Sequence, residues 1–221
     1  MKKKASAGPL NLPNALSLLR MVLVPFFVYA VLELPPATPA GAWIPAAIFA
    51  VTSFTDFLDG QIARRFHMVT DFGKFMDPLA DKFMVFSALL VLCCRYTYYG
   101  PFLIWTTVVV MFRDLGVTSL RLVAAGKSGI VIAASIFGKL KTVSHITGIL
   151  VILLEPLLFP VYGAQICPIG CVMLGVMTVT SVGSGIDYLR AYLPVLGFGA
   201  AAGDASVDSA EGGGKGNPAN T

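Results

Sequence analysis

Four of the five aspartates between residues 56 and 81 are spaced as two pairs, among long apolar runs. Asp56 and Asp59 are three residues apart, and Asp77 and Asp81 are four residues apart. On a helix, both spacings place two carboxylates on one face, with Cβ atoms about 5–6 Å apart. Two such pairs facing each other would form an all-oxygen site of the kind that hard divalent cations prefer.

The cost of these aspartates in an apolar setting also indicates a ligand. An aspartate at the centre of a membrane helix costs roughly 2.5–3.5 kcal/mol on insertion scales. Two bound cations would keep four clustered carboxylates ionised, whereas mutual repulsion would otherwise raise some of their pKa values. Two metal ions held in this way can clamp the attacking and leaving oxygens of a phosphoryl displacement. The spacing favours this chemistry over a set of snorkelling or paired surface acids.

The composition is that of a polytopic membrane protein. Of the 221 residues, 56% are hydrophobic and only 13% are charged, whereas globular domains average about 25% charged residues. The formal net charge of +4 comes from basic residues spread among the flanks of the apolar runs, so we expect no nucleic-acid partner. His67 and His145 are far from any cysteine in sequence, which leaves no zinc-binding spacing.

Six apolar stretches predict an all-α fold with six transmembrane helices. The stretches cover residues 16–32, 43–66, 74–93, 101–123, 139–159 and 169–193. Residues 124–137 are too short to span and are expected to lie along the interface. Residues 1–194 therefore form one membrane domain. Residues 195–221 are rich in Gly, Ala, Ser and Asp, which predicts a disordered cytoplasmic tail.

The basic residues that flank the predicted spans lie almost entirely on one side of the membrane. The side that holds the N-terminus contains Lys2–Lys4, Arg64, Arg65 and Lys74 among others, and the opposite side contains Arg95 alone. The positive-inside rule then places both termini and the acidic stretch in the cytoplasm. We therefore expect the active-site cavity to face the cytoplasm.

The four cysteines fall near the opposite side of the membrane. Cys93 and Cys94 follow the third predicted span, and Cys167 and Cys171 precede or open the sixth. A disulfide between the two pairs would require an oxidising compartment on that side. Spacing leaves this open, and buried free thiols are the favoured interpretation.

The acidic stretch resembles the signature of the CDP-alcohol phosphatidyltransferases, D-x2-D-G-x2-A-R-x8-G-x3-D-x3-D. The matching residues are Asp56, Asp59, Gly60, Ala63, Arg64, Gly73, Asp77 and Asp81. The resemblance implies that the four aspartates bind two Mg²⁺ ions, with Mn²⁺ as an alternative. It also implies that Asp81 is the general base that takes the proton of the acceptor hydroxyl.

The same resemblance implies a binding site for the cytidine diphosphate head of CDP-diacylglycerol. The residues concerned are Asn14, Ser17, Asp59, Gly60, Ala63, Arg64, Thr70 and Gly73. Gly60, Ala63 and Gly73 would leave room for this head. Ser17 stands where some members of the family have threonine in a P-N-x-L-T pattern, so the hydroxyl is kept.

Further segments narrow the resemblance to the bacterial phosphatidylglycerophosphate synthases. These segments are NLPNALSLLR, GKFMDPLADK, RDLGVTSLR, GKLKT and SGIDYL. They imply transfer of a phosphatidyl group from CDP-diacylglycerol to glycerol 3-phosphate in phospholipid biosynthesis. They also imply a homodimer among the lipids of the bacterial inner membrane.

Basic residues outside the signature are candidates for binding the acceptor phosphate. They are Arg20, Arg113, Arg121, Lys139 and Lys141. Cations at this depth in a membrane need an anion, and arginine offers a bidentate fork to phosphate while lysine offers a point charge. The alternative is that they snorkel to the interface.

Other functions remain open at this level. The same fold and chemistry would serve another acceptor, as in a cardiolipin synthase or an enzyme that uses inositol phosphate or serine. A divalent-cation transporter would also use intramembrane carboxylates, but it would place them near the midplane. A scaffold without activity would have little use for an intact signature.

Overall fold

The computed structural model describes residues 12–65, 71–128, 136–160 and 167–193, and every element in these ranges is a helix. The elements are α1 (Leu12–Glu33), α2 (Pro39–Arg65), α3 (Asp71–Arg95), the short 3₁₀ helix η1 (Thr97–Tyr99), α4 (Gly100–Ser128), α5 (Ile136–Leu158) and α6 (Pro168–Tyr192). Side chains are described from residue 15 onward within these ranges, except in 56–78 and 124–136. The predicted tail, residues 195–221, and most of the predicted interfacial piece lie outside the described residues.

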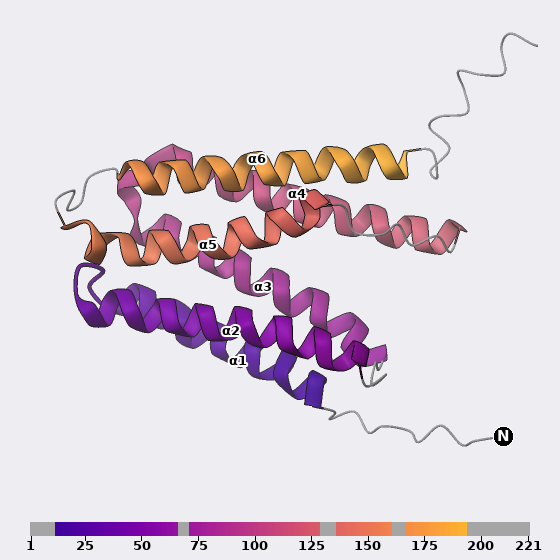
Figure 1. Cartoon of the computed structure of the whole chain (residues 1–221), viewed down its shortest axis with the longest axis horizontal. Helices are drawn as coiled ribbons and strands as arrows, with labels where there is room; N and C mark the ends of the chain where they lie inside the picture. Colours follow the sequence, from indigo (N-terminus) through magenta and orange to yellow (C-terminus); the bar gives the residue numbers. More distant parts are fainter. Residues whose placement is uncertain (1–11, 66–70, 129–135, 161–166, 194–221) are drawn as a thin grey trace, which may run out of the picture.

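The six long helices run back and forth along one axis. Figure 1 shows that α1, α3 and α5 begin at the end of the bundle where α2, α4 and α6 finish. The C-terminal end of α2 and the N-terminal end of α3, which carry the acidic stretch, therefore lie at the same end as the start of α1 and the end of α6. This arrangement follows from each apolar run being long enough for one helix and each break being rich in Pro, Gly or polar residues.

Four of the described helical segments are long and apolar enough to cross a membrane. They are Ala15–Glu33, Thr97–Val123, Phe137–Leu158 and Pro168–Tyr192, and α2 contributes a shorter apolar segment, Pro39–Thr55. The prediction of a helical membrane protein is thus confirmed, while the count of six spans stays a prediction. The exposed side chains agree with a lipid-facing surface, because Phe112 is 80% exposed and Val179 is 71% exposed.

The core lies along the centre of the bundle. Phe27 of α1 packs against Phe49 of α2 with ring centroids 5.7 Å apart, and Leu89 of α3 and Ile152 of α5 join the same buried cluster. Helix α5 also approaches α6 closely, since a Cβ on Gly148 would meet the side chain of Met177. Small residues at such crossings let membrane helices pack backbone to backbone.

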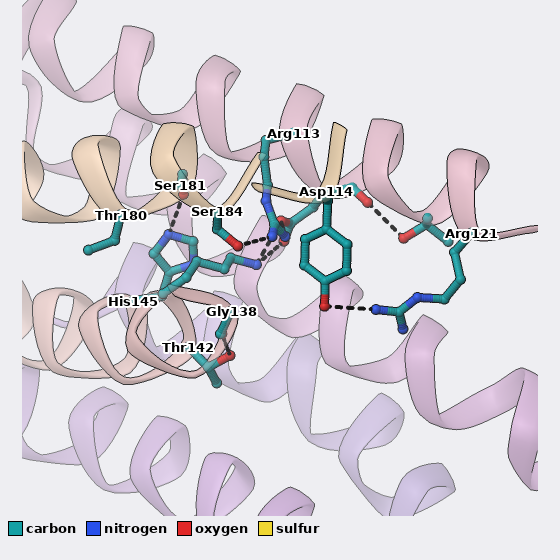
Figure 2. Close-up of polar contacts among 12 residues, drawn as sticks. Arg113, Asp114, Arg121, Gly138, Thr142, His145, Thr180, Ser181 and Ser184 are labelled. Carbon is teal, nitrogen blue, oxygen red and sulfur yellow. Dashed lines mark hydrogen bonds and ion pairs between the residues drawn. The ribbon is translucent and has the colours of Figure 1, made fainter. Parts of the chain in front are cut away.

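Hydroxyl groups along α6 tie that helix to its two neighbours. Thr178 bonds to Thr106 of α4 at 3.0 Å, Thr180 bonds to Ser144 of α5 at 2.8 Å, and Ser181 bonds to the Nε2 of His145 at 2.9 Å. Figure 2 shows the pairing of Ser181 with His145. Hydrogen bonds of this kind between membrane helices average below 1 kcal/mol each, so the series acts together to fix the register of α6.

A second polar cluster lies at the opposite end of the bundle from the acidic stretch. Glu155 of α5 is 3% exposed and accepts hydrogen bonds from the hydroxyls of Tyr98 and Tyr99. Burial raises the pKa of the neighbouring Tyr96, whose hydroxyl therefore stays protonated. The four cysteines nearby are free thiols, as expected, but only Cys167 is buried and Cys94 is exposed.

Candidate active site

A small cavity of about 30 Å³ lies inside the bundle where five helices meet. Its lining comprises Arg20 of α1, Thr52 and Ser53 of α2, Asp81, Met84 and Val85 of α3, Asp114 of α4, and Lys141, Thr142, His145 and Ile146 of α5. Three residues predicted from the sequence thus share one cavity: the predicted base Asp81 and the predicted phosphate ligands Arg20 and Lys141. Their helices are far apart in the chain, so the fold brings them together.

The helical backbone relates this cavity to the other three signature aspartates. Asp77 is one turn before Asp81 on α3, and Asp56 is one turn after Thr52 on α2. Asp59 follows Thr52 by seven residues, or about two turns. Residues at these spacings share a face of a helix. Two helix faces that line the cavity therefore continue into the predicted carboxylate pairs.

The side chains of most signature residues lie outside the described part of the chain. This applies to Asp56, Asp59, Gly60, Ala63, Arg64, Thr70, Gly73 and Asp77, and also to Asn14. Among the side chains that are described, no three of His, Cys, Asp and Glu form a metal-binding group. The metal site consequently stays a prediction. Its support is the donor set itself, because two carboxylate pairs at i, i+3 and i, i+4 suit a hard cation.

Lys141 reaches the cavity as half of a buried ion pair. Its Nζ lies 2.7 Å from Oδ1 of Asp114 and makes a second hydrogen bond to Oδ2. Arg113 donates to the same Oδ1 from Nη1 at 2.9 Å, and its Nη2 bonds to Ser184 of α6. Figure 2 shows Arg113 and Asp114 at the centre of these contacts. One carboxylate therefore joins cations from α4 and α5.

Arg121 belongs to a neighbouring group between α4 and α6. Its Nη2 donates to the hydroxyl of Tyr188 at 3.1 Å (Figure 2). The guanidinium carbons of Arg113 and Arg121 lie 5.4 Å and 5.5 Å from the centroid of the Tyr188 ring. These are cation–π distances. Arg113 and Arg121 therefore lie on related faces of α4, because both contact one ring.

The remaining predicted residues are divided between the interior and the surface. Ser17 is fully buried one turn before Arg20, which is itself 2% exposed. Lys139 is exposed on α5, two residues before Lys141. The structure therefore places Arg20 and Lys141 in the cavity and joins Arg113 to it through Asp114, whereas Arg121 and Lys139 are exposed.

Sequence reasoning missed Asp114, His145 and Tyr188. The sequence did mark Asp114 as unusual, because an acid beside Arg113 in an apolar span needs a partner. That partner, Lys141 of α5, is distant in sequence. His145 is 2% exposed and lines the cavity. Tyr188 lies within the SGIDYL segment, where nothing in the spacing marks it as a contact of two arginines.

Comparison of the sequence with known proteins finds one matching family and several similar proteins. A CDP-alcohol phosphatidyltransferase family model matches residues 10–182. A Bacillus subtilis protein named CDP-diacylglycerol–glycerol-3-phosphate 3-phosphatidyltransferase is 37% identical over 191 residues, which cover 80% of this chain and 93% of the relative. A Mycobacterium tuberculosis protein named probable phosphatidylglycerophosphate synthase is 38% identical over 187 residues, covering 85% and 84% respectively.

A third relative carries the first of these names. It is a protein of Salmonella typhimurium, 33% identical over 186 residues, which cover 82% of this chain and 94% of the relative. The family model spans most of the described helices, including the acidic ends of α2 and α3 and the cavity-lining parts of α1, α4 and α5. With the aspartate signature and the cavity that continues it, these matches show that the chain belongs to the CDP-alcohol phosphatidyltransferase family.

Proposed function

We propose that this protein transfers a phosphatidyl group from CDP-diacylglycerol to glycerol 3-phosphate, giving phosphatidylglycerophosphate and CMP. The observation that carries the proposal is the shared cavity, in which a carboxylate suited to be a base, Asp81, lies with the cations Arg20 and Lys141. The names of the relatives support the same reaction, since they state this donor and acceptor.

The reaction needs a base at the acceptor hydroxyl. A primary hydroxyl of glycerol 3-phosphate attacks the lipid-side phosphorus of CDP-diacylglycerol, a new P–O bond forms, and the P–O bond to CMP breaks. The hydroxyl proton passes to Asp81, and CMP leaves with the bonding electron pair. A base must come within about 2.6–3.2 Å of the hydroxyl for this transfer, and Asp81 lines the same cavity as the cations proposed to bind the acceptor phosphate.

Two Mg²⁺ ions complete the proposed site, with Mn²⁺ as the alternative. Asp56, Asp59, Asp77 and Asp81 would hold them, and bound ions of this kind would neutralise charge on the phosphate oxygens. Arg64 and Thr70 would contact the cytidine diphosphate head, with Asn14 and Ser17 entering from α1. The small residues Gly60, Ala63 and Gly73 would leave room for the cytidine diphosphate head.

The acceptor phosphate would bind to the cations at the other side of the cavity. Arg20 and Lys141 line the cavity, and Arg113 adjoins it through Asp114. The Nε of Arg113 is buried, and no described residue accepts a hydrogen bond from it. A buried donor of this kind is costly unless a ligand or water satisfies it, which supports an anion site here.

We also propose a topology for this reaction. All six long helices cross the bacterial inner membrane, the protein acts as a homodimer, and the end of the bundle that holds the acidic stretch faces the cytoplasm. The alternation of the helices supports an even number of crossings, with the start of α1 and the end of α6 on one side (Figure 1). The one-sided distribution of Lys and Arg supports the orientation. Soluble glycerol 3-phosphate would then reach the site directly.

An acceptor panel tests this function. Purified protein is given CDP-diacylglycerol and Mg²⁺, and CMP release is measured with glycerol 3-phosphate, phosphatidylglycerol, inositol phosphate or serine in turn. We expect release with glycerol 3-phosphate alone. Release with a different alcohol and none with glycerol 3-phosphate would assign the same chemistry to another acceptor.

A further inference from the structure

Asp114 occupies a position between the two groups of cations at the candidate site. Its side chain is 6% exposed. On one side it lines the cavity with Lys141, and on the other it accepts a hydrogen bond from Arg113, which lies along the groove between α4 and α6. Asp114 therefore connects the cavity to the arginines that contact Tyr188.

The pairing leaves donors available for an anion. A lysine ammonium has three N–H donors, and two of those on Lys141 go to the two oxygens of Asp114. The Nε of Arg113 has no acceptor among the described residues. Asp114 thus neutralises part of the charge of both cations without using all their donors, which suits a site that must release its anionic product.

The flexibility of lysine explains why a carboxylate is needed there. The ammonium lies at the end of a four-carbon stem with many rotamers, and a buried ammonium without a partner is strongly unfavourable. Two hydrogen bonds to one carboxylate fix the position of Lys141 and favour its charged form. The short Asp114 side chain, on a different helix, also holds α4 and α5 in register at the cavity.

We propose that Asp114 is a positioning residue for the acceptor-phosphate site. It holds Lys141 at the cavity wall and joins it to Arg113, so that glycerol 3-phosphate meets an ordered pair of cations. Asp114 itself contacts no reacting atom and takes no proton. This inference rests on the proposed function, because it concerns how the acceptor of that reaction is bound.

The test compares Asp114→Asn with a matched change, Asp187→Asn. Asp187 is a half-buried aspartate on α6 that does not line the cavity. We expect Asp114→Asn to raise the KM for glycerol 3-phosphate about tenfold or more, as loss of a charge-assisted contact would. The KM for CDP-diacylglycerol should stay unchanged, and Asp187→Asn should leave both values unchanged. A normal KM for glycerol 3-phosphate in Asp114→Asn would overturn the positioning role.

A double variant distinguishes a role of Asp114 that acts through Lys141 from a role that is independent of Lys141. If Asp114 acts through Lys141, then Asp114→Asn, Lys141→Met and the two together should raise the KM for glycerol 3-phosphate to similar extents, because contacting residues are not additive. Independent roles of the two residues predict additive effects instead, so the double variant would then have a KM raised by about the product of the two single fold-changes.

Two controls keep each outcome informative. Wild-type protein must release CMP when glycerol 3-phosphate is added, and its failure to do so would overturn the proposed function and not the role of Asp114 alone. If Asp114→Asn does not fold, Asp114→Glu replaces it, since this change moves the carboxylate while keeping its charge. A severalfold higher KM for glycerol 3-phosphate in Asp114→Glu supports the positioning role, and an unchanged KM contradicts it.

Discussion

Asp81 of α3 and Lys141 of α5 line the same cavity, although they come from helices that are not consecutive in the chain. One is an acid suited to accept a proton, and the other is a cation suited to bind phosphate. A substrate that carries both a hydroxyl and a phosphate, as glycerol 3-phosphate does, could meet the two residues at once.

Asp81→Asn should retain binding of CDP-diacylglycerol and lose turnover. The amide is nearly isosteric with the carboxylate, but it does not accept the hydroxyl proton in the transition state. General-base catalysis typically contributes about 10²–10⁴-fold, so we expect a fall in kcat of that order. Binding is measured with a labelled CDP-diacylglycerol analogue, and turnover by CMP release. Turnover within a few-fold of wild type would show that another group takes the proton.

Asp56→Ala, Asp59→Ala and Asp77→Ala should each abolish CMP release while the protein still folds. Each change removes one oxygen ligand from a site that depends on paired carboxylates. Binding of Mn²⁺, followed by electron paramagnetic resonance, should weaken in parallel. Asp71→Ala is the matched control, because Asp71 begins α3 and lies outside the signature. Substantial activity in any of the three variants at saturating Mg²⁺ would refute the two-metal assignment.

The sequence predicted the helices well because each depends on a local pattern. The six predicted spans agree with α1 to α6 to within a few residues at most ends, since an apolar run between polar or Pro-rich breaks is sufficient to define a membrane helix. Arg95, predicted to lie on the side of the membrane opposite the acidic stretch, is the last residue of α3, whose first turns carry part of that stretch. Its guanidinium bonds the Leu34 carbonyl at 3.4 Å in the neighbouring loop.

The pairing of residues across helices was beyond the reach of a single sequence. Lys141 and Asp114 lie on different helices, and nothing in either span specifies which face meets the other. Lys139 and Lys141 were both predicted from the sequence to bind the acceptor phosphate. Lys139 is exposed, whereas Lys141 lines the cavity. Two residues of helix separate their directions by about 200°, and only packing decides which one faces inward.

A topology experiment tests the six-span arrangement. Single cysteines at Ala37 and Ser206, in a background without the four native cysteines, should react with a membrane-impermeant reagent from opposite sides. Ala37 is exposed in the connection between α1 and α2, which should lie outside the cytoplasm, and Ser206 lies in the predicted cytoplasmic tail. Labelling of both positions from the same side would contradict six spans.

Gly170→Val should destabilise the protein without a direct effect on the site. A Cβ at position 170 would collide with the hydroxyl of Tyr99 and with Oε2 of Glu155, and overpacking of this kind typically costs about 1–3 kcal/mol. We expect a lower thermal midpoint in detergent. Gly175→Ala is the control, because nothing lies within 4 Å of a Cβ built there. Equal midpoints for both variants and the wild type would show that this end of the bundle adjusts freely.

The most direct test of the account is CMP release by the purified protein with CDP-diacylglycerol, Mg²⁺ and one acceptor at a time. We expect release that depends on glycerol 3-phosphate, yields phosphatidylglycerophosphate and stops when Mg²⁺ is chelated. Release that proceeds equally well with an uncharged alcohol, or that does not require glycerol 3-phosphate, would contradict it, because the cations at the cavity would then have no acceptor phosphate to bind.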